Sequence, residues 1–251
     1  MRFAIAGGTG TVGHLVVEAA RRPGHDTVVL SRATGVDLVT GDALVERLDG
    51  VDAVIDTSST STLNARASVA FFTAVTRNLL EAEQVAGAAH HVALSIVGAD
   101  ETAAGYYAGK AAQERLVAES GRGWTLLRTT QFHEFAAQTA GRSPVLGLRL
   151  VPAMRSQPVA AAEVADELVR LAAGAPQGLV PDLAGPAEER MADLVARYAE
   201  AVGLRGRIVE VPLPGATGKA MRGGALLPGP TARLGVQTFG EWLDGVARGR
   251  R

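Results

Sequence analysis

Residues 1–13, MRFAIAGGTGTVG, place a short apolar run directly before four closely spaced glycines. Gly8, Gly10 and Gly13 fit the spacing G-x-G-x-x-G, and Gly7, Gly10 and Gly13 fit a variant with glycines three residues apart. A strand-to-helix turn that carries a pyrophosphate needs positive φ and close approach of the backbone, with free N–H groups at the helix start. The stretch therefore predicts a dinucleotide-binding loop rather than a simple tight turn, made of Gly7, Gly8, Thr9, Gly10, Thr11, Val12 and Gly13.

The residues that follow this loop alternate between short apolar runs and longer helical patterns. Strands are predicted at 3–6, 27–30, 53–57, 91–96 and 124–128, with a short further one at 36–39. Helices are predicted at 11–22, 43–48, 64–86 and 104–120. Strands joined by helices in this way need right-handed crossovers between parallel strands. The expected fold is α/β, a Rossmann doubly wound parallel sheet with helices on both faces.

The second half of the sequence is less regular and indicates a smaller C-terminal substrate-binding lobe. Its expected elements are helices at 161–172, 188–202 and 239–246, strands at 179–184 and 207–211, and a loop or lid at 212–230. Residues 1–150 are expected to form the nucleotide-binding core, and residues 151–251 most of the lobe. The lobe is expected to interleave with the core rather than to fold independently.

The composition of the 251 residues excludes several classes of function. A formal net charge of -1, from 25 basic and 26 acidic residues, gives no reason to expect nucleic acid or a membrane as a partner. The absence of cysteine excludes disulfides and cysteine nucleophiles, and the five histidines are too scattered for a metal site. With no secretory signal or membrane-spanning run in the sequence, a cytoplasmic monomer or homodimer that acts on a small molecule is expected.

The end of the second predicted strand bears on the choice of nucleotide. Proteins that bind NAD usually place an acidic side chain there for the ribose 2′-OH. This chain has Ser31 and Arg32 instead, and a hydroxyl with a guanidinium suits a 2′-phosphate. The prediction is therefore NADP as cofactor, with NADPH preferred over NADH. The alternatives are that Arg32 is a plain surface cation and that the nearby Asp37 alters the preference.

Other polar residues near strand ends have two interpretations each. Asp42 follows the 36–39 segment and is expected either to contact the adenine edge or to cap the helix that begins at residue 43. Thr57, Ser58 and Ser59 follow a strand at the cofactor-facing edge. They are expected either to line the path of the ribose or to cap the next helix.

Ser95, Tyr106 and Lys110 form the candidate catalytic group. Ser95 ends an apolar strand, and the Y-x-x-x-K spacing puts Tyr106 and Lys110 on one helical face. A nearby ammonium lowers the pKa of a phenol, which then exchanges a proton with substrate while the serine hydroxyl orients a carbonyl. The lysine would also bind the nicotinamide ribose. The chain has only two lysines, which favours this role for Lys110 over that of a solvated helix cation.

Together these residues resemble the short-chain dehydrogenase/reductase superfamily, and more closely its atypical NmrA-like branch of NAD(P)-binding proteins. The resemblance covers most of the chain and is carried by residues 7–13, 30–32, 94–98, 106–114, 124–135, 157–159 and 163–165. It implies that a segment after the sixth predicted strand approaches the nicotinamide end, namely Thr129, Thr130, Gln131 and Phe132. Tyr107 is an alternative to Tyr106 as the acid, and His133 is expected either to contact substrate or to cap or face solvent on the following helix.

Three functions follow from this reading. The first is an NADPH-dependent oxidoreductase that reduces a small, largely apolar carbonyl or quinone-like substrate, with Tyr106 as acid and Lys110 and Ser95 beside it. The second is a non-catalytic redox sensor or regulator that binds NADP(H) and a protein partner. The third is a nucleotide-sugar epimerase or dehydratase, for which arginines in the C-terminal lobe are unspecific support. The set of Ser95, Tyr106 and Lys110 favours the first.

Overall fold

The computed structural model describes two stretches of the chain, residues 1–102 and 104–249. The chain divides into two compact units, each made of two segments. The first unit comprises Met1–Arg128 and Ala162–Pro181, and the second comprises Thr129–Ala161 and Asp182–Arg251. The boundary expected at residue 150 lies inside the second unit. The chain therefore leaves the first unit after Arg128 and returns to it later for a helix and a short strand.

The first unit is built on a parallel sheet in which the strand order is β5-β4-β3-β1-β2. The strands are β1 (Arg2–Ala6), β2 (Asp26–Leu30), β3 (Ala53–Asp56), β4 (His90–Ile96) and β5 (Trp124–Thr129). β5 extends to the second unit with its last residue, and β8 (Gly178–Leu179) pairs with its start. Ile5 lies between Val29 and Ile55 in register. Every residue of β3 is buried, as a strand covered on both faces requires.

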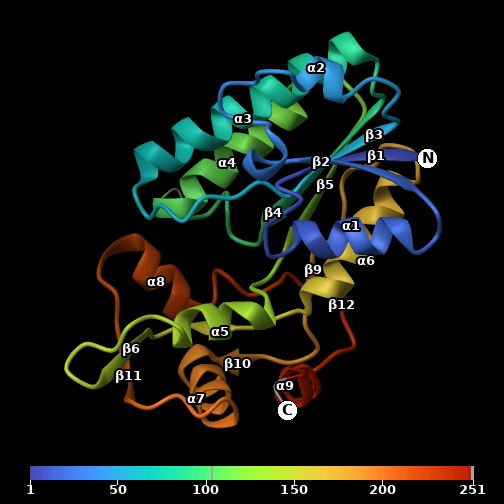
Figure 1. Cartoon of the computed structure of the whole chain (residues 1–251). Helices are drawn as coiled ribbons and strands as arrows, with labels where there is room; N and C mark the ends of the chain where they lie inside the picture. The colour runs from blue at the N-terminus through green and yellow to red at the C-terminus, as the bar shows by residue number, and fades with distance from the viewer. Residues whose placement is uncertain (103, 250–251) are drawn as a thin grey trace. The chain divides into compact units, whose positions relative to one another are not determined.

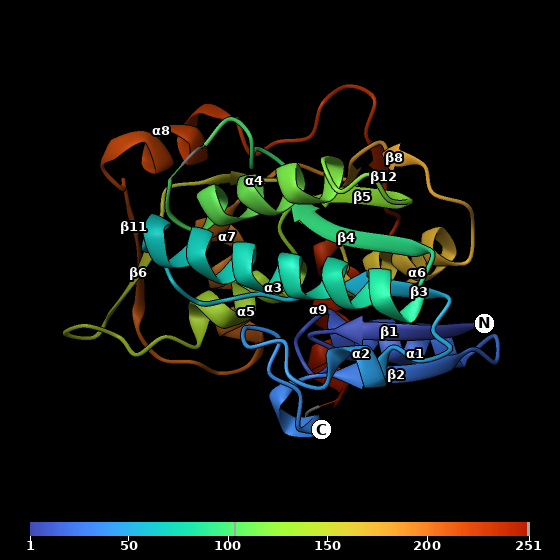
Figure 2. The ribbon, with the colours of Figure 1, turned by 90° about the horizontal axis from the view of Figure 1, so that it is seen from above.

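Helices cover both faces of this sheet. They are α1 (Gly13–Arg21), α2 (Leu44–Arg47), α3 (Ala65–Ala86), α4 (Gly105–Ala118) and α6 (Ala161–Ala172). Figure 1 shows α3 and α4 on one face and α1 and α6 on the other. In Figure 2, α3 and α4 lie side by side along the sheet. A Cβ on Gly109 would lie 2.2 Å from Ser68 Oγ and 2.5 Å from Phe72 Cδ2, so the absent side chain lets α4 approach α3 closely.

The order of the strands places a ligand site at the carboxyl end of β1. From β1 the chain proceeds to β2 on one side and later to β3 on the other. In open α/β sheets, ligands bind outside the carboxyl ends of the strands at such a change of direction. Gly7 and Thr57, the residues that follow β1 and β3, therefore lie at the expected position.

The second unit combines helices with short strands. Its helices are α5 (His133–Ala140), α7 (Met191–Ala201), α8 (Gly215–Gly223) and α9 (Phe239–Gly249). Its strands are β6 (Leu148–Pro152), β7 (Arg155–Ser156), β9 (Leu183–Ala184), β10 (Glu189–Arg190), β11 (Arg207–Val211) and β12 (Arg233–Leu234). β6 pairs in parallel with β11, and β7 pairs antiparallel with β10. The rings of Tyr198 and Trp242 stack at 6.0 Å between centroids, and Phe239 packs against His133 at 5.6 Å.

Three predicted elements differ from the structure. The segment 36–39 is not a strand: Val36 and Leu38 are buried alternately, but Asp37 Oδ1 accepts from the Val39 N–H and folds the chain into a turn. The strand expected at 179–184 is instead two strands of two residues, β8 and β9. The loop expected at 212–230 contains α8, which a left-handed glycine, Gly224, ends at φ 87°.

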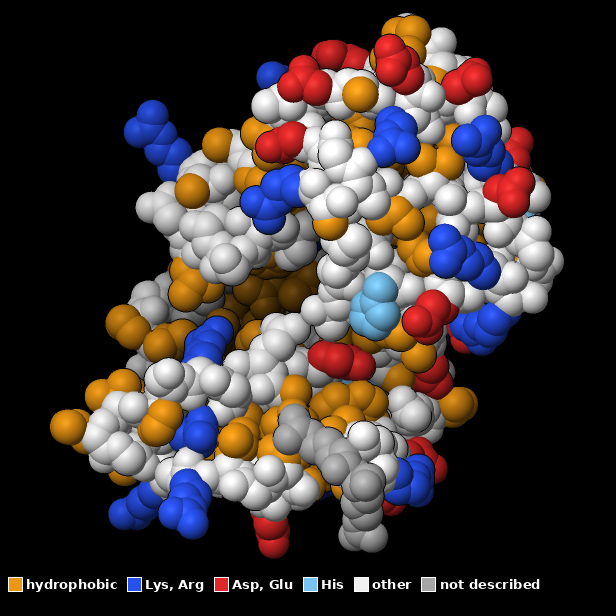
Figure 3. Space-filling view, in the orientation of Figure 1, with side chains coloured by type: hydrophobic (Ala, Val, Ile, Leu, Met, Phe, Trp, Pro, Cys, Tyr) orange, Lys and Arg blue, Asp and Glu red, His pale blue; other side chains and the backbone are white. Residues whose placement is uncertain are grey.

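The surface of the first unit carries mixed charges. Figure 3 shows acidic and basic side chains interspersed in the upper part of the view, where α2 lies. This mixing agrees with the formal net charge of -1. Within the described residues, no helix combines the length and apolar character that would let it cross a bilayer.

Candidate functional site

The glycine loop, residues Gly7 to Gly13, forms a tight cradle from backbone alone. The Gly7 N–H donates to Leu30 O over 2.9 Å, and the Gly10 N–H donates to Gly7 O over 2.8 Å. Gly7 has φ +74°, and a Cβ there would lie 2.9 Å from Thr57 O. A Cβ on Gly13 would lie 2.2 Å from Gly7 O. The sequence folds this way because neither position leaves space for a side chain.

The crest of the cradle is open to solvent. Thr9, Gly10 and Thr11 are exposed, whereas Val12 and Gly13 are buried. α1 begins at Gly13, and Val12 at its N-cap makes no side-chain cap bond. The His14 N–H of the first turn donates to Gly10 O over 3.1 Å, and the helix dipole at this N-terminus favours an anion. These residues fit a nucleotide pyrophosphate.

The turn after β2 holds the residues predicted to choose between NAD and NADP. Ser31 is buried, with its Oγ 3.3 Å from Thr34 Oγ1, and Arg32 opens a single 3-10 turn, η1 (Arg32–Thr34). Arg32 is exposed and makes no ion pair within the part of the chain that the structure describes. Arg47 Nη2 on α2 donates to Thr34 O over 2.6 Å. Sequence reasoning missed Arg47, because only the fold brings α2 to this turn.

Asp42 does not cap α2. Its Oδ2 accepts from Thr40 Oγ1 over 2.8 Å, and α2 begins two residues later at Leu44. The N-cap residue is Ala43, at φ 61°, which offers no capping side chain. The capping interpretation of Asp42 was therefore wrong, because the chain turns through a left-handed residue before the helix. Asp42 is exposed, and its contact with adenine stays a prediction.

The residues after β3 are fixed by hydrogen bonds at the mouth of the cradle. Thr57 Oγ1 donates to Ala6 O over 2.7 Å, and the Ser58 N–H donates to Asp56 Oδ1 over 2.8 Å. Ser59 is exposed and its Oγ lies 3.1 Å from Tyr106 OH. Asn64, rather than these residues, caps α3 by accepting from the Ala67 N–H. The helix-capping alternative for the three residues is therefore wrong.

Lys110 is buried on α4, with its Nζ surrounded by acceptors. Nζ donates to Leu94 O at 2.9 Å, to Gln113 Oε1 at 2.8 Å and to Ser58 O at 3.5 Å. It also lies 4.4 Å from the centroid of the Phe72 ring. Burial lowers the pKa of Lys110 to about 8, against the opposing charges of nearby carboxylates. The ammonium is thus positioned at the carboxyl ends of β3 and β4.

Tyr106 lies one helical turn before Lys110, but other groups determine the pKa of its phenol. Burial raises the pKa of Tyr106 to about 12, while the hydrogen bond with Ser59 opposes this and the Asp56 charge adds to it. The lowering of this pKa expected from Lys110 is therefore wrong. The neighbouring Tyr107 is buried, and its ring lies 6.3 Å from that of Tyr106.

Ser95 is held in an ionic cluster with Glu114, which lies one helical turn after Lys110 on α4. Its Oγ donates to Glu114 Oε1 over 2.5 Å. Arg128 donates to both oxygens of Glu114, over 2.9 and 2.6 Å, and to Asp100 over 2.9 Å. These carboxylates raise the pKa of Arg128, most strongly through the hydrogen bonds of Glu114. The hydroxyl proton of Ser95 is thus already engaged in a hydrogen bond within the protein.

The five remaining candidates, residues 129–133, lie in the second unit, and Thr130 Oγ1 donates to Gln157 O over 2.6 Å. Thr129 and Gln131 are buried, and Gln131 Oε1 accepts from Ser156 Oγ over 2.9 Å. Phe132 is the N-cap residue of α5 and bridges to Val159. His133 is 1% exposed at the start of α5, with Nε2 3.1 Å from Gln237 O. His133 thus packs inside its unit, so the expected surface position is wrong.

Among residues 1–102 and 104–249, no group of three or more His, Asp or Glu side chains is arranged to hold an ion. His90 and His91, which sequence reasoning took as structural, are buried. His90 Nε2 lies 2.8 Å from Thr125 Oγ1, and His91 Nδ1 lies 2.7 Å from Glu83 Oε1. These contacts join strands and helices inside the first unit.

A parallel sheet with an open backbone cradle at its change of strand order defines a dinucleotide-binding protein of Rossmann type. Comparison of the sequence with known families agrees, since the profile described as NAD(P)H-binding matches residues 7–174. The chain belongs to this NAD(P)H-binding family. No curated protein matches the sequence significantly.

Solved structures with the same fold include reductases and epimerases. The NADPH-dependent quinone oxidoreductase of Escherichia coli, complexed with NADPH, is 21% identical with a TM-score of 0.73, over 97% of this chain and 99% of that one. A nucleoside-diphosphate-sugar epimerase of Staphylococcus aureus is 16% identical with a TM-score of 0.71, over 97% and 99%. The UDP-glucose 4-epimerase of Thermus thermophilus, complexed with NAD, is 19% identical with a TM-score of 0.66, over 100% and 94%. These similarities show that the chain shares the Rossmann-like NAD(P)-binding fold of these proteins.

Proposed function

We propose that this protein is an NADPH-dependent reductase of a small, largely apolar carbonyl or quinone-like substrate. The observation that carries the choice of NADPH is the turn after β2, where Arg32 is exposed and Arg47 reaches the same turn. No acid occupies the two positions after this strand, where NAD-binding proteins place one. The E. coli quinone oxidoreductase, which was solved with NADPH, supports the proposal through its fold.

The bound nicotinamide would supply hydride to the substrate carbon. The glycine loop would hold the pyrophosphate, and Ser31, Arg32 and Arg47 the 2′-phosphate. Lys110 would hold the nicotinamide ribose. Tyr106 would donate a proton to the substrate oxygen. A pKa of about 12 keeps this phenol protonated over the physiological range, which suits an acid in a reduction better than a base in an oxidation.

The residues proposed for substrate are Tyr107 in the first unit and three residues in the second. These three are Gln131, Phe132 and His133, and Thr129 is proposed for the cofactor. The hydroxyl of Ser95 is used on Glu114, so we propose that Ser95 acts by holding this carboxylate and not by donating to a carbonyl. The orienting donor would then be Tyr106.

The test is consumption of NADPH with a panel of quinones and ketones, comparing wild type with Tyr106→Phe. A reductase should oxidise NADPH with at least one member of the panel, and loss of the phenol proton should lower kcat about 100-fold or more. Affinity for NADPH should be kept in the variant. Tyr107→Phe is the matched control, and a larger loss there would transfer the acid role to Tyr107. Turnover unaffected by both variants would exclude a tyrosine acid.

A redox sensor is the second candidate, and a specific observation favours it. The polar groups that a catalyst would offer are largely satisfied within the protein: Lys110 meets three acceptors, and Ser95 donates to Glu114. Tight binding of NADPH without turnover on any member of the panel would favour the sensor. The epimerase hypothesis has support only from fold similarity, and a preference for NAD would favour it over both.

A further inference from the structure

A buried polar cluster lies behind the carboxyl ends of β3 and β4, and we call Asp56, Gln113 and Lys110 the lysine cluster. Asp56 and Gln113 are fully buried, and Lys110 is 4% exposed. Gln113 donates from Nε2 to Asp56 Oδ2 over 2.7 Å. Its Oε1 accepts from Lys110 Nζ over 2.8 Å. The Gln113 amide therefore links two charged groups. Its nitrogen bonds to the carboxylate of Asp56, and its oxygen bonds to the ammonium of Lys110.

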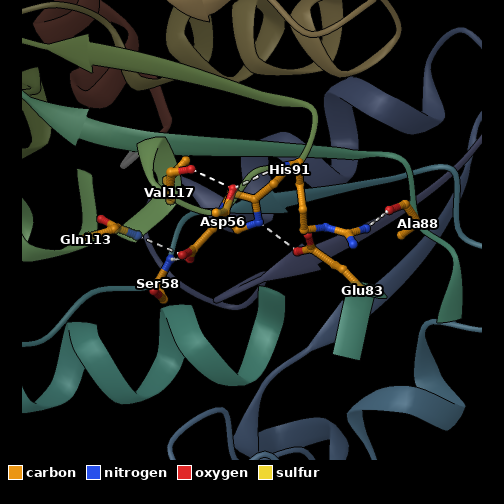
Figure 4. A network of polar contacts seen from close by, with 9 residues as sticks. Asp56, Ser58, Glu83, Ala88, His91, Gln113 and Val117 are labelled. Atoms are coloured by element: carbon orange, nitrogen blue, oxygen red, sulfur yellow. Dashed lines mark hydrogen bonds and ion pairs between the residues drawn. The ribbon is translucent and has the colours of Figure 1, made fainter. Parts of the chain in front are cut away.

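The chemistry of the three groups fixes the direction of this link. An ammonium only donates and a carboxylate only accepts, so the oxygen of Gln113 must face Lys110 and its nitrogen must face Asp56. The other oxygen of Asp56 accepts from the Ser58 N–H over 2.8 Å. Figure 4 shows the Asp56 side chain pointing toward Ser58 and Gln113. The carboxylate is thus anchored to the backbone that follows β3.

The three hydrogen bonds that the Lys110 ammonium donates differ in length. Those to Leu94 O and Gln113 Oε1 are 2.9 and 2.8 Å long, whereas the one to Ser58 O is 3.5 Å. A hydrogen bond at this length is weak. It is therefore the bond that a ligand hydroxyl can replace at least cost. Ser58 also lies beside the glycine loop, since a Cβ on Gly7 would be 3.0 Å from Ser58 Cα.

We propose that Asp56 and Gln113 are positioning residues for Lys110. Gln113 holds the ammonium between the ends of β3 and β4, and Asp56 keeps it charged, with the N–H that now meets Ser58 O turned to a ribose hydroxyl when the nucleotide binds. Only this last clause rests on the proposed function. The groups that face Lys110 are Asp56 from β3, Glu114 from α4 itself, the Phe72 ring from α3 and a backbone carbonyl from β4.

The lysine content of the chain allows a direct test without nucleotide. Lys110 and Lys219 are the only lysines, and Lys219 is exposed on α8. Protein labelled with ¹³C at the lysine Cε would give two resonances, which Lys219→Arg assigns. In wild type, Lys110 should titrate near pH 8, because burial lowers its pKa to about 8.

Three variants should move the Lys110 midpoint in directions that follow from the cluster. Asp56→Asn removes the charge that favours the ammonium, so the midpoint should fall by about one pH unit. Gln113→Met removes an acceptor at equal length, so the midpoint should also fall. The double variant Asp56→Asn with Gln113→Glu places the carboxylate directly beside the ammonium without setting two carboxylates 2.7 Å apart, so the midpoint should rise. Gln84→Met, on the exposed face of α3, is the control and should change nothing.

The pair of opposite shifts separates positioning from simple damage to the fold. If Asp56→Asn alone does not fold, Gln113→Met and the double variant still decide. An unchanged midpoint in both would overturn the proposal, as would a shift of the same sign in both. The ribose clause is tested by the Kd for NADPH, measured by fluorescence between pH 7 and 9.5. It should weaken as Lys110 deprotonates, earlier in Gln113→Met, and a flat profile would remove that clause. Failure of wild type to bind NADPH at any pH would instead refute the proposed function.

Discussion

The glycine loop and the lysine cluster lie at the same edge of the sheet but are made of different parts of the chain. The loop is formed by consecutive residues, and its contacts are backbone N–H and C=O groups. The cluster joins side chains from β3 and α4, more than fifty residues apart in the sequence, inside the protein. A loop of this kind depends on the absence of side chains. A cluster depends on charges and hydrogen bonds that match, and the two should therefore respond to different substitutions.

A second buried charge pair behind the sheet extends the comparison. His91 and Glu83 have side chains that are 0% and 1% exposed, and Figure 4 shows them pointing toward each other. Burial alone would lower the pKa of His91, but the charge and hydrogen bond of Glu83, with Asp56, raise it above its usual value. This pair holds α3 to β4 and has no contact with the glycine loop. It is therefore a buried ion pair with a structural role, in contrast to the lysine cluster.

The largest expected effect is on stability, from His91→Ala. The free energy of unfolding should fall by about 3–5 kcal/mol, because Glu83 is left buried without its partner. Urea denaturation at pH 6 measures this loss, and the double variant His91→Leu with Glu83→Leu should recover most of it. Because the pKa of His91 is raised in the folded state, the stabilisation is complete below about pH 6.5 and is lost as the pH rises through the folded-state pKa. The stabilising role of the pair would be contradicted if the stability of the wild type rose over this pH range and that of the double variant did not.

A smaller effect is expected on binding when a side chain is added to the loop. Gly13→Ala places a Cβ 2.2 Å from Gly7 O, so the cradle must open. Overpacking of this kind costs about 1–3 kcal/mol, and the Kd for NADPH should rise roughly 10- to 100-fold. Gly245→Ala is the matched control, since a Cβ there meets nothing within 4 Å. Equal affinity in the two variants would show that the loop is not the binding site.

The smallest effects are expected from the arginines at the turn after β2. Arg32→Ser should weaken binding of NADPH about tenfold and leave that of NADH unchanged, because a charge-assisted bond to the 2′-phosphate is lost. Arg47→Ser should cost about threefold, since part of its hydrogen bonding serves Thr34 and not the ligand. Fluorescence titration with both nucleotides measures the ratio. A parallel loss of both affinities would indicate loop damage rather than recognition of the phosphate.

The sheet and its covering helices were predictable because their signals are local. Apolar runs and helical periodicity placed β1 to β5 and α3 within a residue or two of their observed ends. The 36–39 segment failed although Val36 and Leu38 are buried in alternation, because Asp37 bonds its own backbone and bends the chain. The two-residue strands of the second unit were not predicted, because two residues are too few to show an alternating pattern.

The candidate site was predictable only where it is made of backbone. The spacing of the glycines indicates the cradle directly, since each needs the absence of a Cβ. The partners of the side chains could not be read from the sequence: Gln113 and Asp56 beside Lys110, and Glu114 beside Ser95, come together only through the packing of α4 on the sheet. A polar residue three positions after Lys110, on the same helical face, was the available signal for Gln113.

The three crossings of the chain between its units have a consequence for how the molecule is made. α6 contributes Leu168 and Leu171, both fully buried, to the first unit, yet it is synthesised after a segment of the second. A ribosome that has released residues 1–128 has therefore delivered a sheet with one face still partly bare. A fragment cut at that point should expose apolar surface and aggregate, and a faithful minimal version of the nucleotide-binding half would need α6 joined back by a short designed linker.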